Sequence, residues 1–453
     1  MTLANLTHGK NSGVLRGRPS PGSGSDQQGA GSGQGDRAPE QPGAEADPGT
    51  RSEQPGTGAD RRLWEAAIHE LSELERPSAS EGERRAAEWI AERLRELGYP
   101  ARVEREEAHG GYWWPLGLAN ALAAAGGLVS LRTRAGLARL LAGLSGGVAA
   151  AVVWDDVNAN LRWRRALLPH RATWNVVAEA GDPEAGRTVL VVAHHDAAHS
   201  GLVFHPALSR IGPRLAPRLH ERSRHTLPIM HLVWGGPLLV SAGAALARRW
   251  LRGAGVALSL GTVAAMADIG RRAVVPGAND NLSAVAVVLA LAERLRERPL
   301  AGLRVLLVST GSEESFSEGM HGFARRHFPR LDPGRTEVLC LECLGGPRLI
   351  VLEGEGMLVM RDYPQHLREE LATAAAEAGV SVERGLRTVA ATDGLVSMRA
   401  GYPTVTLASV DFTKMPLNYH WPTDRPEALH WQTIERAIAV CERFLRRRAA
   451  AEE

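Results

Sequence analysis

The stretch VLVVAHHDAAHSG, residues 189–201, places two adjacent histidines and an aspartate directly after an apolar run. A β-branched run that ends near glycine is typical of an interior strand, and ligands bind at the carboxyl ends of such strands in open α/β sheets. His194 and Asp196 are therefore candidate site residues. Taken alone, such histidines more often only cap the strand or pair with backbone groups.

Four further polar clusters follow predicted strands or precede a predicted helix: PGANDN with Asp280, STGSEES with Glu313 and Glu314, LCLECLG with Glu342, and NYHWPTD with His420. An ordinary helix cap, solvated loop carboxylates and a surface histidine would explain three of them separately. Glu342 is harder to explain, because a carboxylate buried in an apolar strand costs several kcal/mol unless it is paired or bound to a metal. Together the clusters suit two zinc ions that share a bridging carboxylate and leave another carboxylate as a base.

Strand-like and helix-like segments alternate along the chain and would position these clusters. Helical periodicity over residues 61–100 precedes the strand ARVEREE. Further strands are predicted at WNVVAEA, RTVLVVAHHD, LRVLLVST, TEVLCLE, RLIVLEG and TVTLASV, and further helices at NLSAVAVVLALAERLRERP, HLREELATAAAEAG and TIERAIAVCERFLRRR. This order predicts an α/β fold with a largely parallel sheet.

The composition is that of a folded protein, with 453 residues of which 44% are hydrophobic. The formal net charge of +2 gives no indication of nucleic-acid binding through phosphate neutralisation. Three cysteines are too few for a disulfide framework. Cys340 and Cys343 would face opposite sides of one strand, so we interpret these two and Cys441 as small buried residues rather than as a zinc knuckle.

Residues 1–60 are rich in Gly, Ser, Pro, Gln and Asp and lack apolar periodicity. Such a segment cannot bury enough surface to offset its ordering entropy, so we expect a disordered tail. No basic start followed by an apolar core is visible, and we therefore expect no cleavable secretory signal.

Two hydrophobic insertions interrupt the α/β order, at residues 108–156 and within 200–272. Each contains a pair of apolar Gly/Ala-rich runs joined by a basic link, and each is predicted to form a helical hairpin. Aromatic flanks and basic tips favour a membrane-associated protein, with the tips on the cytoplasmic side. The alternative is a soluble cytoplasmic protein whose hairpins pack on the catalytic body or at a dimer interface.

The ordered series AHHD, GANDN, EE, LECLG and NYHWPTD resembles the M28-type zinc exopeptidases, which include bacterial aminopeptidases and glutamate-carboxypeptidase-like enzymes. The resemblance runs from about Arg61 to Arg448 and is broken by the two insertions. It implies a three-layer sandwich around a central mixed, mostly parallel sheet in a catalytic domain spanning residues 61–453. The segment TDGLVSMRAGYPTV, which contains Asp393, adds to the likeness.

The resemblance implies a role for each matching residue. His194 and Glu342 would bind the first zinc ion, Glu314 and His420 the second, and Asp280 would bridge the two. Glu313 would act as general base and Asp196 as the catalytic carboxylate that orients His194. Further candidates near the substrate or behind the ligands are Asp393, Asp424, Tyr419 and Asn281.

The implied activity is hydrolysis of peptide bonds by a zinc-bound hydroxide. We expect an exopeptidase, and an aminopeptidase rather than a carboxypeptidase. Glu342 stands where the family usually has aspartate, and its extra methylene would alter metal spacing or selectivity. A single-zinc glutaminyl cyclase and a membrane-anchored, non-catalytic binding protein are the alternatives. We expect a peptide as the partner and no nucleic acid, and the sequence gives no oligomeric state.

Overall fold

The computed structural model describes residues 60–451, and every structural statement below concerns this part of the chain. The described residues belong to one compact unit. The disordered tail expected over residues 1–60 lies, apart from Asp60, outside the described residues.

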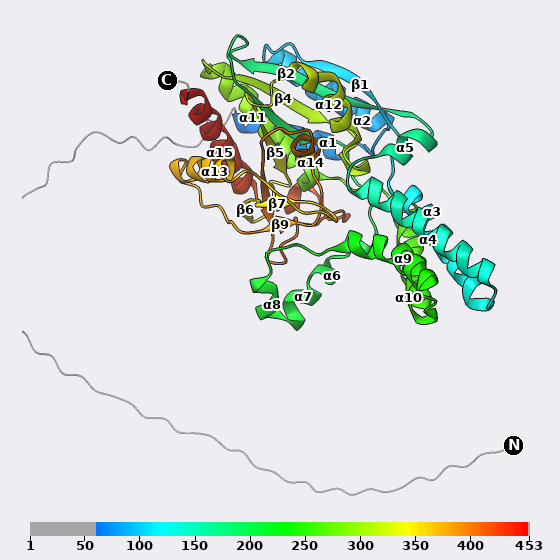
Figure 1. Ribbon diagram of the computed structural model, residues 1–453. Helices are drawn as coiled ribbons and strands as arrows, with labels where there is room; N and C mark the ends of the chain where they lie inside the picture. The colour runs from blue at the N-terminus through cyan, green and yellow to red at the C-terminus, as the bar shows by residue number, and fades with distance from the viewer. Residues whose placement is uncertain (1–59, 452–453) are drawn as a thin grey trace, which may run out of the picture. The chain divides into compact units, whose positions relative to one another are not determined.

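A seven-stranded sheet in the order β1-β2-β4-β3-β5-β10-β6 forms the centre of this unit (Figure 1). The sheet is mixed, as predicted, but it is not mostly parallel, because three strand pairs are parallel and three are antiparallel. Its middle strands β4, β3, β5 and β10 run parallel, whereas the β1–β2, β2–β4 and β10–β6 pairs are antiparallel. The strands are β1 (Arg102–Ala108), β2 (Arg171–Gly181), β3 (Thr188–His194), β4 (Arg304–Thr310), β5 (Thr336–Glu342), β6 (Arg348–Val351) and β10 (Thr404–Val410).

Helices cover both faces of the sheet and complete the predicted three layers. The apolar faces of the first group pack with alternate strand residues such as Val191, Leu307 and Leu407 into the main core. This group is α1 (Asp60–Ser72), α2 (Glu81–Glu96), α11 (Ser283–Glu297), α13 (Gln365–Glu377) and α15 (Trp431–Ala450). On the opposite face, α12 (Glu318–His327) and α14 (Asp393–Arg399) pack against residues such as Val192 and Val308. Every residue of β3 and β10 is buried, which explains their continuous apolar runs.

Shorter elements connect these layers. A three-stranded sheet contains β7 (Gly354–Glu355), β8 (Arg361–Asp362) and β9 (Arg387–Thr388). The short helices are α5 (Arg162–Leu167), α6 (Pro206–Ser209), α7 (Ile211–Leu215) and α8 (Pro217–Arg222), and 3-10 turns span Leu202–Phe204, Glu313–Ser315, Phe328–Arg330 and Pro426–Ala428. A π-helical turn, Ala278–Leu282, precedes α11.

The two hydrophobic insertions form four long helices that lie together at one side of the sheet domain (Figure 1). They are α3 (Trp113–Arg132), α4 (Gly136–Val157), α9 (Ile229–Ala245) and α10 (Arg249–Ile269). Glycine allows their backbones to approach closely: a Cβ on Gly255 would lie 2.6 Å from the amide nitrogen of Val240, and one on Gly236 would lie 2.5 Å from Oγ of Ser259. We call these four helices the apolar bundle.

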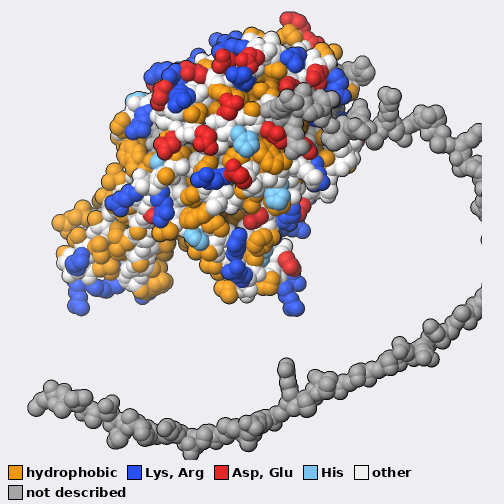
Figure 2. Space-filling view, turned by 180° about the vertical axis from the view of Figure 1, so that it is seen from behind, with side chains coloured by type: hydrophobic (Ala, Val, Ile, Leu, Met, Phe, Trp, Pro, Cys, Tyr) orange, Lys and Arg blue, Asp and Glu red, His pale blue; other side chains and the backbone are white. Residues whose placement is uncertain are grey.

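The inner and outer surfaces of the apolar bundle differ in residue size. Many buried positions are small, as at Ala123, Ala142, Gly146 and Ser259, although larger side chains such as Leu116 are buried as well. Large apolar side chains face outward, including Leu118, Leu122, Leu137, Leu140, Leu144, Leu232, Leu246 and Trp250. Figure 2 shows hydrophobic side chains gathered over the protruding helices, with Lys and Arg at their tip.

Candidate metal centre

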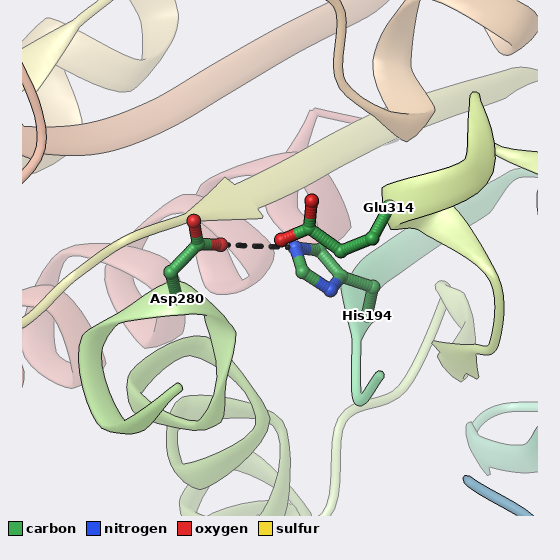
Figure 3. A group of neighbouring side chains, drawn as sticks. All are labelled: His194, Asp280 and Glu314. Carbon is green, nitrogen blue, oxygen red and sulfur yellow. Dashed lines mark ion pairs between the residues drawn. The ribbon is translucent and has the colours of Figure 1, made fainter. Parts of the chain in front are cut away.

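The sheet brings the predicted polar clusters to one edge. His194 ends β3, Glu313 and Glu314 follow β4, Glu342 ends β5, and His420 lies in the loop after β10. Because these four strands are parallel neighbours, their carboxyl ends meet at the same edge. Asp280 reaches the same point from the π-helical turn before α11 (Figure 3).

Asp280 lies between the two histidines. Its Oδ1 is 3.3 Å from Nε2 of His194, and its Oδ2 is 3.3 Å from Nε2 of His420. Each oxygen of one carboxylate therefore faces a different imidazole. This is the arrangement that a carboxylate shared by two metal ions requires.

The remaining predicted ligands and the predicted base lie beside these histidines. Glu342 Oε1 is 3.6 Å and Glu313 Oε2 is 3.8 Å from Nε2 of His194. Glu314 Oε2 is 3.1 Å from Nε2 of His420. The structure thus brings together all five predicted ligands and the predicted base.

Asp196 connects His194 to the backbone of the glutamate pair. Its Oδ1 lies 3.4 Å from Nδ1 of His194 and accepts a hydrogen bond from the amide of Glu313 (3.0 Å). Its Oδ2 accepts hydrogen bonds from the amide of Glu314 (3.1 Å) and from the hydroxyl of Ser78 (2.7 Å). This carboxylate fixes the ring of His194 relative to both glutamates.

Asp424 and Asn281 hold the other side of the centre. The carboxylate of Asp424 accepts hydrogen bonds from the amides of Asn279 (2.7 Å) and Asp280 (3.1 Å). The side chain of Asn281 donates to the carbonyl of Leu341 (3.0 Å) and accepts from the amide of Cys343 (2.9 Å). These contacts bracket Glu342 and fix the backbone at Asp280.

The last two predicted residues also lie at the centre. The ring of Tyr419 stacks on that of His420 with centroids 3.8 Å apart. Asp393 is buried and accepts a hydrogen bond from the hydroxyl of Thr310, the last residue of β4. Its burial raises the pKa of the carboxyl to about 7.

The negative charge of the carboxylates in this cluster favours the binding of cations. Burial lowers the pKa of His420, but Glu314 and Asp280 outweigh this effect and raise it to about 10. The pKa of His194 is likewise raised well above its usual value, mainly by Asp196 and Asp280, against the effect of burial. Negative potential from the surrounding carboxylates therefore dominates at both imidazoles.

Zinc fits this donor set. His194 Nε2, Asp280 Oδ2 and Glu314 Oε1 are buried and have no hydrogen-bond partner within the described residues. Ligand atoms of the same three residues lie within 4.8 Å of one another (Figure 3). Buried polar atoms are rarely left without partners, and imidazole and carboxylate groups are ordinary zinc ligands.

The backbone is strained where it delivers the glutamates and His420. Ser312, Phe316 and Ser317, on either side of the glutamate pair, adopt positive φ angles of 50°, 67° and 55°. Cys343, directly after Glu342, has φ 52°, and His420 itself has φ 49°. Positive φ is uncommon for residues other than glycine, and such conformations persist only where the surroundings enforce them.

Other histidines near the strand end lie away from the centre. His195 Nδ1 is 2.9 Å from the hydroxyl of Ser309, and burial lowers the pKa of His195 to about 3, so the ring is neutral. His199 Nδ1 lies 2.8 Å from the carbonyl oxygen of Arg272. His205 caps α6 by accepting a hydrogen bond from the amide of Ala207.

Sequence reasoning missed Arg76, a fully buried arginine in the loop between α1 and α2. Its guanidinium donates to the carbonyls of Leu71 (3.0 Å), His195 (2.7 Å), Pro276 (2.7 Å) and Gly277 (2.8 Å). Burial lowers its pKa to about 10, so it remains charged at pH 7. Arg76 therefore ties the loop after His194 to the turn that carries Asp280.

Sequence reasoning also missed Glu83, because this residue lies in an ordinary charged helix, EGERRAAEWIAERLRE. Its buried carboxylate accepts hydrogen bonds from the amide and hydroxyl of Ser312 and from the hydroxyl of Thr173. This contact supports the strained turn before Glu313. Sequence reasoning also assigned Cys343 only to the core, as a small buried residue, whereas its thiol donates to Glu342 Oε1 (3.2 Å).

Comparison with sequence families finds a match over part of the chain. Residues 260–445 match the sequence model described as peptidase family M28. The resemblance to peptidase family M28 is confirmed. The matched region contains every predicted metal ligand except His194.

Solved structures confirm the fold. A glutaminyl cyclase from Tannerella forsythia has a TM-score of 0.51 at 14% identity, with 85% of this chain and 97% of that chain covered. A glutaminyl cyclase from Bacteroides thetaiotaomicron has a TM-score of 0.50 at 12% identity, with the same coverage. An aminopeptidase from Aneurinibacillus sp. strain AM-1 has a TM-score of 0.48 at 12% identity, with 84% and 92% covered. No curated protein matches the chain.

Replacing Arg76 tests the buried contacts that hold the centre. Arg76→Met would leave several carbonyl groups without donors, each at a cost of roughly 1–3 kcal/mol. We expect the free energy of unfolding, measured in denaturant by tryptophan fluorescence, to fall by at least about 3 kcal/mol. Arg85→Met, at an exposed position of α2, is the control and should change stability by less than about 0.5 kcal/mol. Equal effects of both substitutions would contradict the role of Arg76.

Proposed function

We propose that this protein is a co-catalytic di-zinc metallopeptidase that removes residues from the amino terminus of peptides. One observation carries the proposal: the two oxygens of Asp280 face the two histidines at equal distances of 3.3 Å. His194 and Glu342 would hold one ion, and Glu314 and His420 the other. When bound, zinc ions lower the pKa of water and polarise the carbonyl of the scissile bond.

Glu313 is the proposed general base. Burial raises the pKa of its carboxyl well above the usual value, and the neighbouring carboxylates of Glu342 and Glu314 raise it further. A carboxylate beside the bound ions would accept a proton from the attacking water and return it to the leaving amine. In the proposed reaction Glu313 Oε2 carries that proton, while Asp196 keeps His194 and the amide of Glu313 in place.

The charges around the centre favour an amino terminus over a carboxyl terminus. Carboxylates surround the site and would attract a free ammonium group. Lys414 also lines the cavity, but its ammonium group donates to the carbonyls of His220 (2.6 Å), Glu221 (3.1 Å) and Ser223 (2.6 Å). Its donors are therefore occupied and would not bind a substrate carboxylate.

Metal content and hydrolysis of aminoacyl and peptide substrates test this proposal. We expect two zinc equivalents in the purified protein, loss of both zinc and activity in Asp280→Ala, and retention of zinc in Glu313→Gln with kcat reduced roughly 10²- to 10⁴-fold. Glu92→Gln, at an exposed position of α2, is the control and should behave like the unmodified protein. Full activity of Glu313→Gln would contradict its role as base.

Glutaminyl cyclisation is the second candidate, and the structural likeness to two glutaminyl cyclases favours including it in the assay. A single zinc equivalent, together with conversion of amino-terminal glutamine to pyroglutamate, would replace the peptidase proposal. Zinc-loaded protein without either activity would favour a binding protein on the same fold.

We further propose that the apolar bundle is inserted in a membrane. Three of its helices, Trp113–Arg132, Gly136–Val157 and Arg249–Ile269, are long and apolar enough to cross a membrane, and Ile229–Ala245 is a shorter apolar helix. Small residues inside and large apolar residues outside are typical of helices that pack within lipid. The stretches 113–154 and 229–267 contain no acidic residue.

The charges and aromatic residues suggest the orientation. The helix ends away from the catalytic centre carry Arg132, Arg134, Arg139, Arg248, Arg249 and Arg252, and the opposite ends carry Trp113, Trp114, Trp154 and Trp234. Basic residues are retained on the cytoplasmic side and tryptophans gather at the interfaces. The arginine ends would therefore be cytoplasmic.

Fractionation of cells that express the full chain tests insertion. We expect the protein to stay in the membrane fraction after carbonate extraction and to require detergent for release, because the outward leucines contact lipid. Replacing Leu118, Leu122, Leu140 and Leu144 together by Gln should release it. A monodisperse oligomer in buffer without detergent would contradict insertion and indicate that these residues form an interface between copies.

A further inference from the structure

A cavity of about 340 Å³ extends from the candidate metal centre to the apolar bundle. One end is lined by Asp280, Glu313, Glu314, Glu342 and His420. The walls beyond this end come mainly from α9, α10 and the segment 386–392. The inserted helices therefore form part of the same cavity as the groups proposed to perform hydrolysis.

Helix α10 contributes one continuous stripe to this cavity. Its lining residues recur at helical spacing over three turns: Ala257, Leu258, Gly261, Thr262, Ala265, Met266 and Ile269. At 1.5 Å per residue this stripe is about 18 Å long. The first turn of α9 adds Ile229, Met230, Leu232 and Val233, and the turn before α6 adds Val203 and Phe204.

Several polar groups in these walls are already engaged. Besides Lys414, two of these groups are hydroxyls: that of Thr226 accepts a hydrogen bond from the amide of Val389 (2.7 Å), and that of Thr392 caps α14. The hydroxyl of Thr262 donates to the carbonyl of Leu258 within α10 (3.1 Å). Away from the carboxylates, most lining residues are apolar and favour hydrocarbon over a charged group.

We propose that this cavity binds a long hydrocarbon chain attached next to the scissile amide, so that the enzyme acts on strongly apolar substrates. The assignment rests on the proposed hydrolytic function. The chain is carried either by the side chain of the amino-terminal residue or by the leaving amine. In both cases the amide lies at the carboxylates and the hydrocarbon lies along α10.

Two homologous substrate series test the assignment with the zinc-loaded full chain. The first consists of amino acid anilides with linear alkyl side chains of one to ten carbons, and the second of alanine N-alkyl amides of the same lengths. We expect kcat/KM to rise about fourfold per methylene in one series until the chain reaches the end of the cavity. The series that responds identifies where the hydrocarbon is attached.

A matched pair of glycine variants on α10 separates cavity filling from other effects. A Cβ on Gly261 or on Gly253 would meet no atom within 4 Å, but only Gly261 lines the cavity. We expect Gly261→Phe to lower the ratio of kcat/KM for the longest and shortest substrates at least tenfold. Gly253→Phe should leave this ratio unchanged, and measuring both variants in the same detergent cancels partitioning of substrate into micelles.

Binding to Glu313→Gln provides a second measurement that does not require turnover. The dissociation constants of the responsive alkyl series, measured by calorimetry, should fall with chain length in this variant and rise again when Gly261→Phe is added. Hydrolysis of alanine substrates without any dependence on chain length in either series would overturn the assignment and leave the peptidase proposal standing. If no substrate were hydrolysed, the peptidase proposal would be overturned instead. In that case the cavity assignment would also fail if the dissociation constants of Glu313→Gln did not depend on chain length.

Discussion

Carboxylates concentrated in a buried space repel one another, and the rest of this structure depends on how that repulsion is offset. Six carboxyl groups gather at the carboxyl edge of the parallel strands. Four of them are buried, those of Asp196, Asp280, Glu314 and Asp393, and those of Glu313 and Glu342 lie among them. Two imidazoles alone do not supply enough positive charge, which explains why the pKa values of both histidines are raised. Two divalent cations would offset most of this negative charge and satisfy the unpartnered atoms of the cluster.

The surrounding fold holds these charges at fixed positions through backbone contacts. Asp196 binds the amides of the glutamate pair, and Asp424 binds the amides at Asp280. Arg76 and Glu83 lie behind these residues. Arg76 donates to the carbonyl of Gly277, before the turn that carries Asp280, and Glu83 accepts a hydrogen bond from the hydroxyl of Ser312 in the strained turn. Groups that are locked in this way need little reorganisation during a reaction, which is the usual basis of electrostatic catalysis.

The α/β fold and the five polar clusters could be predicted from sequence because their signals are local. β3 is a continuous apolar run that ends in His194, and Glu342 is an isolated charge within another such run. Arg76 and Glu83 have no local signal, since they lie among many charged residues and act largely through contacts with residues far away in the sequence, such as 119 and 229 positions away. The cavity along α10 could not be predicted either, because it depends on how the insertions pack against the sheet domain.

The central claim is that Asp280 lies between two metal ions, and anomalous diffraction at the zinc edge from crystals of the zinc-loaded protein tests it most directly. We predict two peaks on opposite sides of the Asp280 carboxylate, one next to His194 and Glu342 and the other next to Glu314 and His420. A single peak, or two peaks that do not share Asp280, would contradict the co-catalytic arrangement.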